Sequence, residues 1–426
     1  MNTTKLLNFI KDGGLDTRLA EIYGSDKIAY QKKRYEEAAK EFLSIYGERE
    51  VSLFSVPGRS EISGNHTDHN HGKVLAGSID LDIIAVAAKT DDGTVRIKSK
   101  GFDEDVVVLD EYKEPRECHK FKSVSLVAGM ARAFSDASLK TGGYVAYTTS
   151  DVFKGSGLSS SAAFEVMVGN IFNYLYNDGK ADNADIAKMA QFAENRFFGK
   201  PCGLMDQTAC AVGGVVYIDF KDTSRPEIKK IDFDLTGAGY SLCIVDTGGN
   251  HADLNEDYAS VPAEMKSVAK FFGKEVLREI EKSDVLSHIK ELREAVGDRA
   301  ILRSLHFFDE NVRVEKQANA LICGDIKTFF EYVLKSGNSS FKYLQNVYTV
   351  KNVSEQGLSL ALCLAESVLA DVGGAFRVHG GGFAGTTQAF VPIDYTDKYK
   401  KVMDDAFGEG ACHVLRIRAD GAIKVL

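Results

Sequence analysis

The segment that most constrains the fold is KGSGLSSSAAFEVMVGN, at residues 154–170. Its glycines let the backbone approach a ligand closely, and its serines stand where a helix begins and the first N–H groups lack intrahelical partners. Such a helix start, at the positive end of the helix dipole, is suited to phosphate. One serine would be explained as a helix cap, but three in a row after Gly-x-Gly exceed that need. The sequence therefore predicts a phosphate-binding loop, and not a Walker A loop, because no Gly-x4-Gly-Lys-[Ser/Thr] occurs.

A second polar segment, VPGRSEISGNHTDHNHGKVLAGSIDLD at residues 56–82, crowds charged and imidazole side chains among small residues. Its histidines have the short spacing of metal ligands: His66, His69 and His71. The alternative is a site for a small polar ligand such as a polyol, with hydroxyls bound by Asn65, Asp68 and Asn70 and charge supplied by Arg59. A plain polar loop explains the same pattern, so three interpretations stay open at this point.

Two further segments carry candidate residues that are weak on their own. GKPCGLMDQTACAVGG, at residues 199–214, holds Asp206, and Glu194 lies upstream in AENRFFG on an expected helix. A lone aspartate at a turn is usually a turn former, but paired acids near a phosphate loop could hold Mg²⁺ and accept a proton. RVHGGGFAGTTQAFV, at residues 377–391, predicts either a tight turn or a loop pressed against a substrate or another domain.

Apolar periodicity indicates interleaved helices and strands. Residues 1–50 are typical of helices, and short Val- and Ile-rich runs predict strands from residue 51 onward. Further helices are expected at residues 123–138, 159–178 and 183–198. This pattern favours an α+β fold with mixed sheets over a doubly wound parallel fold. We expect a boundary near residues 220–235, which gives domains 1–225, with 1–50 as a helical N-terminal extension, and 226–426.

Composition argues against several classes of protein. The 52 basic and 61 acidic residues give a formal net charge of −9, which is not typical of a nucleic-acid binder. The seven cysteines include no Cys-x-x-Cys pair, so neither a disulfide framework nor a zinc knuckle is expected. No stretch approaches the roughly 20 apolar residues that span a bilayer, and the N-terminus is too polar for a signal peptide. We therefore expect a cytoplasmic protein without nucleic-acid or membrane partners.

In chain order, these segments resemble the galactokinase branch of the GHMP small-molecule kinases. GRSEISGNHTDHNHGKVL is similar to the galactokinase signature, Gly-Arg-x-Asn-x-x-Gly-Glu-His-Thr-Asp-Tyr-Asn. KGSGLSSSAA resembles the phosphate loop of the family, GLMDQ its catalytic-acid segment, and GGGFAG its C-terminal glycine motif. The resemblance runs from about residue 51 to residue 395, and it implies a two-domain GHMP kinase fold with the active site in the cleft between the domains.

The resemblance also implies a role for each candidate residue. Asp206 would take the proton from the anomeric hydroxyl of the sugar, and Arg59 would polarise that hydroxyl and offset charge. Mg²⁺ would be held by Ser161 and Glu194. The sugar would be lined by Asn65, His66, Thr67, Asp68, Gly203 and Tyr258. ATP would be bound by Ser99, Gly155, Ser156, Gly157, Leu158, Ser159, Ser160 and Ser161.

The implied activity is that of an ATP-dependent sugar 1-kinase, with galactose 1-phosphate and ADP as the expected products. Three departures from the family pattern bear on it: Glu61 replaces an Asn, Asn65 replaces a Glu, and Thr386 replaces a Cys. Because the replaced Glu normally contacts the sugar, a kinase for a galactose relative altered at C6, such as galacturonate, is an alternative. A non-catalytic member that binds sugar and ATP is an alternative of another class, which the intact Asp206 and serines disfavour.

Overall fold

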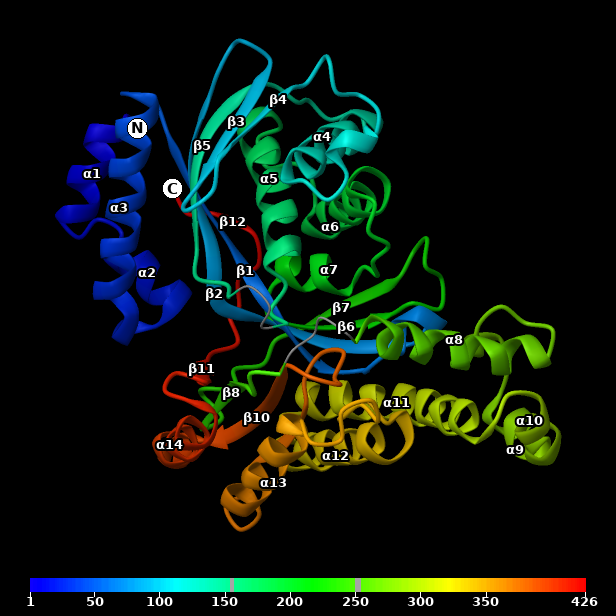
Figure 1. Ribbon diagram of the computed structural model, residues 1–426. Coiled ribbons are helices and arrows are strands. Elements are labelled where there is room, and N and C mark those ends of the chain that lie inside the picture. Colours follow the sequence, from blue (N-terminus) through cyan, green and yellow to red (C-terminus); the bar gives the residue numbers. More distant parts are fainter. Residues whose placement is uncertain (154–156, 250–253) are drawn as a thin grey trace.

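The structure is a computed structural model that describes residues 1–153, 157–249 and 254–426. Two sheets organise this part of the chain (Figure 1). The larger has eight strands in the order β12-β1-β2-β5-β3-β4, with β6 and β7 continuing from the other end of β2. The β3–β5 pair is parallel and the other pairs are antiparallel, so this sheet is mixed. Its strands are β1 (Ser52–Ser63), β2 (Lys73–Lys89), β3 (Thr94–Ser99), β4 (Glu104–Val108), β5 (Tyr144–Ser150), β6 (Val215–Asp219), β7 (Glu227–Ile231) and β12 (Ile423–Lys424).

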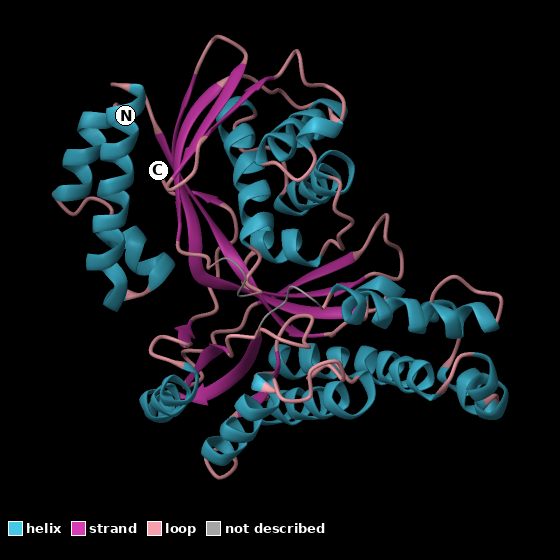
Figure 2. Ribbon diagram, viewed as in Figure 1, coloured by secondary structure: helices cyan, strands magenta, loops and turns pink. Residues whose placement is uncertain are grey.

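The smaller sheet is antiparallel and is built from the second half of the chain, in the order β11-β8-β10-β9. Its strands are β8 (Tyr240–Asp246), β9 (Ala375–Val378), β10 (Thr386–Pro392) and β11 (Cys412–Leu415). The helices of this half lie around and beyond this sheet (Figure 2), and the one at Asp298–Ile322 also packs against β2 of the larger sheet. They are α8 (Asn255–Phe271), α9 (Lys282–Ser287), α10 (Ile289–Ala295), α11 (Asp298–Ile322), α12 (Ile326–Ser339), α13 (Gly357–Leu369) and α14 (Thr396–Phe407).

Helices cover both faces of the larger sheet, as Figure 1 shows. One face carries α1 (Thr3–Lys11), α2 (Asp16–Tyr23) and α3 (Ile28–Tyr46). The other carries α4 (Ser123–Asp136), α5 (Ser160–Tyr176), α6 (Asn183–Phe192), which continues as a π-helical turn (Ala193–Phe198), and α7 (Met205–Val212). Successive side chains of a strand point to opposite faces. Ile84 and Val86 accordingly join the core under α1–α3, whereas Ala85 and Ala87 join the core under α4–α7.

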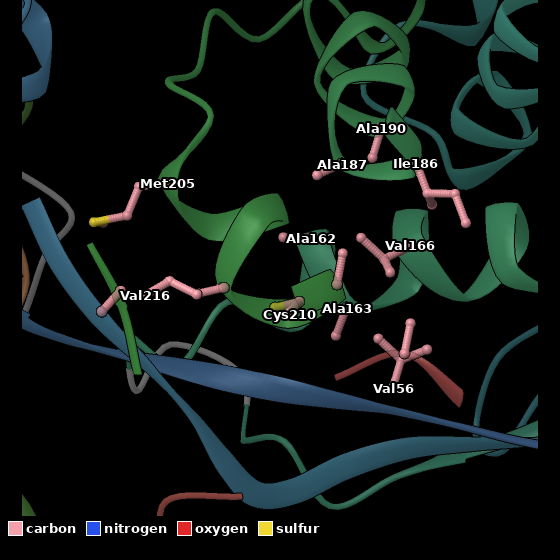
Figure 3. Close-up of a cluster of buried hydrophobic side chains, with 14 of the residues drawn as sticks. Val56, Ala162, Ala163, Val166, Ile186, Ala187, Ala190, Met205, Cys210 and Val216 are labelled. Atoms are coloured by element: carbon pink, nitrogen blue, oxygen red, sulfur yellow. The ribbon is translucent and has the colours of Figure 1, made fainter. Parts of the chain in front are cut away.

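Small side chains let α5 and α7 approach the sheet and each other closely. Figure 3 shows Ala162 and Ala163 of α5 beside Cys210 of α7, with Val56 of β1 below them. These side chains are buried, at no more than 1% exposure. Close packing of short side chains brings backbones together and fixes their relative position. The first turns of α5 and α7, which carry the predicted phosphate loop and Asp206, are therefore held near the same stretch of β1.

The predicted fold class is confirmed: helices and mixed strands alternate along the chain, and residues 1–50 form helices up to Tyr46. The helices expected at residues 123–138, 159–178 and 183–198 are also present. The division into 1–225 and 226–426 stays a prediction. The larger sheet takes β7 and β12 from beyond residue 225. No helix in the described ranges is both long and apolar enough to cross a membrane.

Candidate active site

The predicted phosphate loop leads into α5 beside strand β1. Gly155 and Ser156 lie outside the described residues, and Leu158 accepts a hydrogen bond of 3.1 Å from the backbone N–H of Arg59 through its carbonyl oxygen. A Cβ atom at Gly58 would lie 2.8 Å from that same oxygen, so glycine is required for this close approach. The pairing of β1 with β2 is irregular between Pro57 and Arg59, which re-aims the side chain that follows.

Arg59 and Asp206 form a two-pronged ion pair, although 147 positions separate them in the sequence. The Nε atom of Arg59 donates to Oδ1 of Asp206 at 2.7 Å, and its Nη2 atom donates to Oδ2 at 2.8 Å. The third guanidinium nitrogen donates to the carbonyl oxygen of Gly157. Ser159, which has a φ of 58°, donates its hydroxyl to Asp206. One arginine thus joins the carboxylate to the phosphate loop in a fixed geometry.

The carboxyl group of Asp206 is an anion in this setting. Burial alone would raise its pKa, but the charge of Arg59 and the hydrogen bonds from Arg59 and Ser159 hold the pKa below the ordinary value. Asp206 also stands in the first turn of α7, where the helix dipole favours negative charge. Its side chain remains 33% exposed. The group can therefore accept a hydrogen bond from a ligand while staying charged.

The polar loop at residues 64–72 is locked against the glycine loop at residues 380–385. The Nε2 atom of His66 lies 2.8 Å from the carbonyl oxygen of Gly381. Burial lowers the pKa of His66 to about 4, so the ring is neutral and donates this bond. Tyr258 donates its hydroxyl to the carbonyl oxygen of Gly382 at 2.8 Å, and a Cβ atom at Gly381 would lie only 2.6 Å from the tyrosine ring. The glycine loop is thus pressed against another part of the protein, one of the two predicted alternatives.

Asn65 is fully buried, and the protein uses both atoms of its side-chain amide. The amide nitrogen donates to Glu61 at 2.9 Å and to the carbonyl oxygen of Gly380 at 2.5 Å. The amide oxygen accepts from Asn346 at 2.6 Å. Two departures from the galactokinase signature therefore concern side chains that contact each other. The signature has Asn before Glu, and this chain keeps one amide and one carboxylate in reverse order. That contact could not be inferred from either position alone.

The other predicted sugar residues have different surroundings. The hydroxyl of Thr67 closes its own loop, with the carbonyl oxygens of Gly64 at 2.8 Å and Lys73 at 2.7 Å. Asp68 and Gly203 come together, because a Cβ atom at Gly203 would lie 2.7 Å from the Asp68 carboxylate. The structure thus brings these residues close to one another. Their roles toward a sugar stay predictions.

A cavity of about 520 Å³ is lined by the predicted nucleotide residues Ser99, Ser160 and Ser161. The hydroxyl of Thr148 donates to that of Ser99 at 2.8 Å, at the edge where β3 and β5 run parallel. Aromatic and aliphatic side chains, including Phe102, Leu126, Phe164 and Phe198, line the cavity together with polar residues such as Lys100, Asp103 and Asp105. A largely apolar cavity that ends on a helix N-terminus suits a flat base attached to phosphates.

Glu194 lies in a buried acidic group together with Glu165. It is 3% exposed and accepts hydrogen bonds from Gln207 at 2.8 Å and from Lys200 at 3.2 Å. Gln207 also donates to Glu165 at 3.1 Å. Burial, followed by the charge of Glu194, raises the pKa of Glu165 well above its ordinary value, and one carboxyl oxygen of Glu165 has no hydrogen-bond partner.

The hydroxyl of Ser161 and the carboxylates of Glu165 and Glu194 are oxygen ligands of the kind that Mg²⁺ prefers. Mg²⁺ takes few ligands from the protein when phosphates supply others. Ser161 and Glu165 are four positions apart on α5, so they lie on the same face of that helix. Among the described residues, no three His, Cys, Asp or Glu side chains gather as a metal cluster. The spacing of His66, His69 and His71 left a histidine metal site open, but these side chains form no such cluster in the described part of the chain. The ring centroids of His66 and His69 lie 6.4 Å apart.

Sequence patterns missed two residues that shape the site. His379 lies between the two halves, with Nε2 3.2 Å from the hydroxyl of Ser60 and Nδ1 2.8 Å from that of Thr386. Glu310 of α11 accepts hydrogen bonds from Ser63 at 2.9 Å and from the N–H of Gly64 at 3.1 Å, directly before the polar loop. The His379–Ser60 and Glu310–Ser63 contacts span 319 and 247 positions, and no local signal marks them. The departure at Thr386 is accommodated, because its hydroxyl has a partner in His379.

Comparison with known proteins places this site in a family. Residues 125–214 match the model of the GHMP kinases N terminal domain, and residues 40–89 match the galactokinase galactose-binding signature. The chain is 30% identical over 379 residues to a galactokinase of Streptomyces coelicolor, an alignment that covers 88% of this chain and 94% of that protein. The chain belongs to the galactokinase family. Another galactokinase, from Actinobacillus pleuropneumoniae serotype 3, is 30% identical over 374 residues, 87% of this chain and 93% of that protein.

Solved structures of the wider group share the fold. Lactococcus lactis galactokinase, solved in complex with galactose, gives a TM-score of 0.74 at 23% identity, with 90% of this chain and 98% of that chain covered. A mevalonate kinase gives a TM-score of 0.61 at 14% identity, with 86% and 99% covered. These similarities confirm the predicted GHMP kinase fold. Membership in the galactokinase family makes the protein a sugar kinase, and the family implies ATP as the phosphoryl donor.

Proposed function

We propose that the protein transfers the γ-phosphoryl group of ATP to the anomeric hydroxyl of galactose and releases galactose 1-phosphate and ADP. The observation that carries this proposal is the Arg59–Asp206 pair, which joins strand β1, inside the galactose-binding signature, to the phosphate loop. An anionic carboxylate at this junction can meet a sugar hydroxyl on one side and a phosphoryl group on the other. The Lactococcus relative solved with galactose supports the choice of sugar.

The chemistry that we assign to these residues is mainly positioning and charge stabilisation. Asp206 accepts a hydrogen bond from the C1 hydroxyl. As the new O–P bond forms and the bond to the β-phosphate oxygen breaks, the hydroxyl proton passes to Asp206. A carboxylate with a lowered pKa is a weak base, so this proton leaves late, when the sugar oxygen has already become acidic. Arg59 holds Asp206 in place and offsets the negative charge of the phosphoryl group.

The other residues bind and orient the two substrates. His66, Asp68, Gly203 and Tyr258 form the sugar side, and the buried side chains of Asn65 and Thr67 hold the loops that carry it. The 520 Å³ cavity and the loop at residues 155–161 hold ATP, with Ser99 at the nucleoside end. Ser161 and Glu194 would hold Mg²⁺, which, when bound, neutralises phosphate charge. Release of Glu194 from Lys200 would free the carboxylate for this purpose.

Replacing Asp206 with Asn tests the proposal, because the amide keeps the shape but cannot accept the proton. We expect galactose-dependent ADP formation to fall about 10²–10⁴-fold, with ATP binding retained. His69→Ala is the matched control, since that ring is 47% exposed in the same region, and it should leave the rate near that of the wild type. A variant Asp206→Asn with more than about a tenth of the wild-type rate would contradict the role of Asp206.

A panel of sugars separates this function from its alternatives. Galactose, 6-deoxygalactose, galacturonate and N-acetylgalactosamine are each assayed for ADP formation with the wild-type protein. The proposal requires galactose to be phosphorylated at least as well as the others. Activity on galacturonate alone would assign a C6-altered substrate, and ATP binding without activity on any sugar would assign a non-catalytic role.

A further inference from the structure

The outer face of the larger sheet holds a buried polar network that the proposed transfer does not use. At its centre lies Asp82 of β2, which is fully buried. The Asp82 carboxylate binds Arg34 of α3 at 2.6 Å and the hydroxyl of Tyr23 of α2 at 2.5 Å. Arg418, close to the C-terminal strand, lies 3.2 Å from the same group. The network therefore joins the helices of the N-terminal extension to the sheet by charge as well as by apolar packing.

Arg34 bridges β2 and β5 where their pairing ends. Its Nη2 atom donates to the carbonyl oxygens of Asp82 at 2.8 Å and Thr149 at 3.1 Å, and its Nη1 atom lies 3.2 Å from the carboxylate of Asp151. The regular pairing of β5 stops at Ser150, and the N–H of Asp151 then donates to the Asp82 carbonyl oxygen at 2.9 Å. The guanidinium thus fixes the direction in which the chain leaves the sheet.

The chain that leaves the sheet here forms a wall of the nucleotide cavity. Thr149, Ser150 and Val152 line the 520 Å³ cavity together with Ser160 and Ser161 of the phosphate-loop helix. On the opposite side, Ser150 and Val152 border a second cavity of about 370 Å³, whose other wall is the start of α3. One short stretch of backbone therefore has the nucleotide cavity on one side and the N-terminal helices on the other.

We propose that Arg34 is a positioning residue for the nucleotide. Arg34 lies on the outer face of the sheet and fixes the backbone of residues 149–153. That backbone forms the wall of the nucleotide cavity and leads into the phosphate loop. The identity of the nucleotide rests on the proposed function. The proposal gives the helices of residues 1–50 a role in substrate binding. Loss of Arg34 removes the support of the Thr149 carbonyl group and leaves buried Asp82 with fewer partners, so the wall shifts. The polar loop at residues 64–72 is held by other contacts and should stay in place.

The test compares variants of the full-length protein by calorimetric titration with a non-hydrolysable ATP analogue, by KM for each substrate and by melting temperature. Arg34→Met keeps the length of the side chain but removes its charge and donors. We expect it to weaken analogue binding and raise the KM for ATP about tenfold, with the KM for galactose changed less than about twofold. Arg34→Lys keeps the charge but cannot bridge both strands, so it should restore part of the affinity.

Phe42→Leu is the matched control, because Phe42 is also a buried residue of α3 but lies outside the polar network. It should lower the melting temperature without changing nucleotide affinity. If Arg34→Met does not fold, Asp151→Asn and Arg34→Lys decide, each with an expected loss of affinity of about threefold. Unchanged affinity in the folded variants, or an equal rise of both KM values, overturns the proposal. Because analogue binding needs no sugar, a failure to phosphorylate galactose would refute the proposed function and leave this inference standing.

Discussion

Asp82 and Glu310 are both fully buried carboxylates held by two arginines, but they organise different parts of the molecule. Asp82 joins the N-terminal helices, the larger sheet and the C-terminal segment behind the nucleotide cavity. Glu310 joins α11 to the end of β1 and to the start of the polar loop, with Arg313 at 2.6 Å and Arg377 at 3.7 Å. The two substrate sites thus have separate supports, so a change at one support should affect mainly one substrate.

The largest expected effect is that of Glu310→Gln. Removing the charge breaks the ion pair of Arg377, which is 1% exposed, with Glu310, and breaking a buried ion pair typically costs about 3–5 kcal/mol of unfolding free energy. Because Glu310 holds Ser63 and Gly64, the KM for galactose should rise while ATP affinity is retained. Urea unfolding and two-substrate kinetics provide the measurement. A rise confined to the KM for ATP would contradict the division between the two supports.

Asp82→Asn is the matching change on the nucleotide side. We expect a somewhat smaller loss of unfolding free energy, about 2–4 kcal/mol, because an amide keeps partners in Tyr23, Ser55 and the backbone nearby. Here the affinity for the ATP analogue should fall and the KM for galactose should stay near the wild-type value. Equal effects on both substrates in both variants would mean that the two networks act as one.

A dependence on pH sharpens the comparison, because His306 lies beside Arg313 and Ser339, in the network around Glu310. Burial lowers the pKa of His306 to about 4, so the folded protein keeps the ring neutral at a pH where the unfolded chain, with a pKa near 6.5, binds a proton. Stability from this source is present above about pH 6.5 and is lost as the pH falls toward 4. Asp82 and Glu310 both have lowered pKa values, so their contributions are lost only at lower pH.

The wild type should lose unfolding free energy when the pH is lowered from 7 to 5. We expect this loss to be about 2 kcal/mol smaller in the variant His306→Gln. Urea unfolding at the two pH values measures the difference. His288→Gln, a change at an exposed histidine, is the control and should reduce it much less. An identical pH dependence in His306→Gln and the wild type would show that the ring is not held neutral by the fold.

The smallest effect is expected at Arg18, whose ion pair with Asp420 also links the N-terminal helices to the C-terminal segment but lies at the surface. With side chains 34% and 41% exposed, such a pair contributes about 0.5 kcal/mol or less. Arg18→Ala should leave nucleotide affinity unchanged, and the effect on unfolding should shrink further in high salt. A loss comparable to that of Asp82→Asn would show that the surface pair, and not burial, holds the N-terminal helices.

The sequence predicted those parts of the molecule that local chemistry determines. The short Val- and Ile-rich runs predicted strands from residue 51 onward, and the serines marked the start of α5 to within one residue. The resemblance to galactokinases implied that Arg59 and Asp206 lie together, which no local pattern could show. Neither approach indicated that Ser159 binds Asp206 instead of capping the helix, because its left-handed backbone depends on contacts made elsewhere. The partners of Arg34 and Glu310 were equally hidden, since they come from distant parts of the chain.

The position of the C-terminal segment has a consequence for how the protein is made. β12 pairs with β1, Arg418 reaches Asp82, and the carbonyl oxygen of Ile423 accepts a hydrogen bond from Asn170 in α5. Ribosomal synthesis proceeds from the N-terminus, so the residues that complete the first-made sheet emerge last. Until residue 418 has been synthesised, Asp82 can pair with Arg34 but lacks its second partner, Arg418. Fragments that end before residue 416 should therefore expose an open edge on β1 and be prone to associate through it.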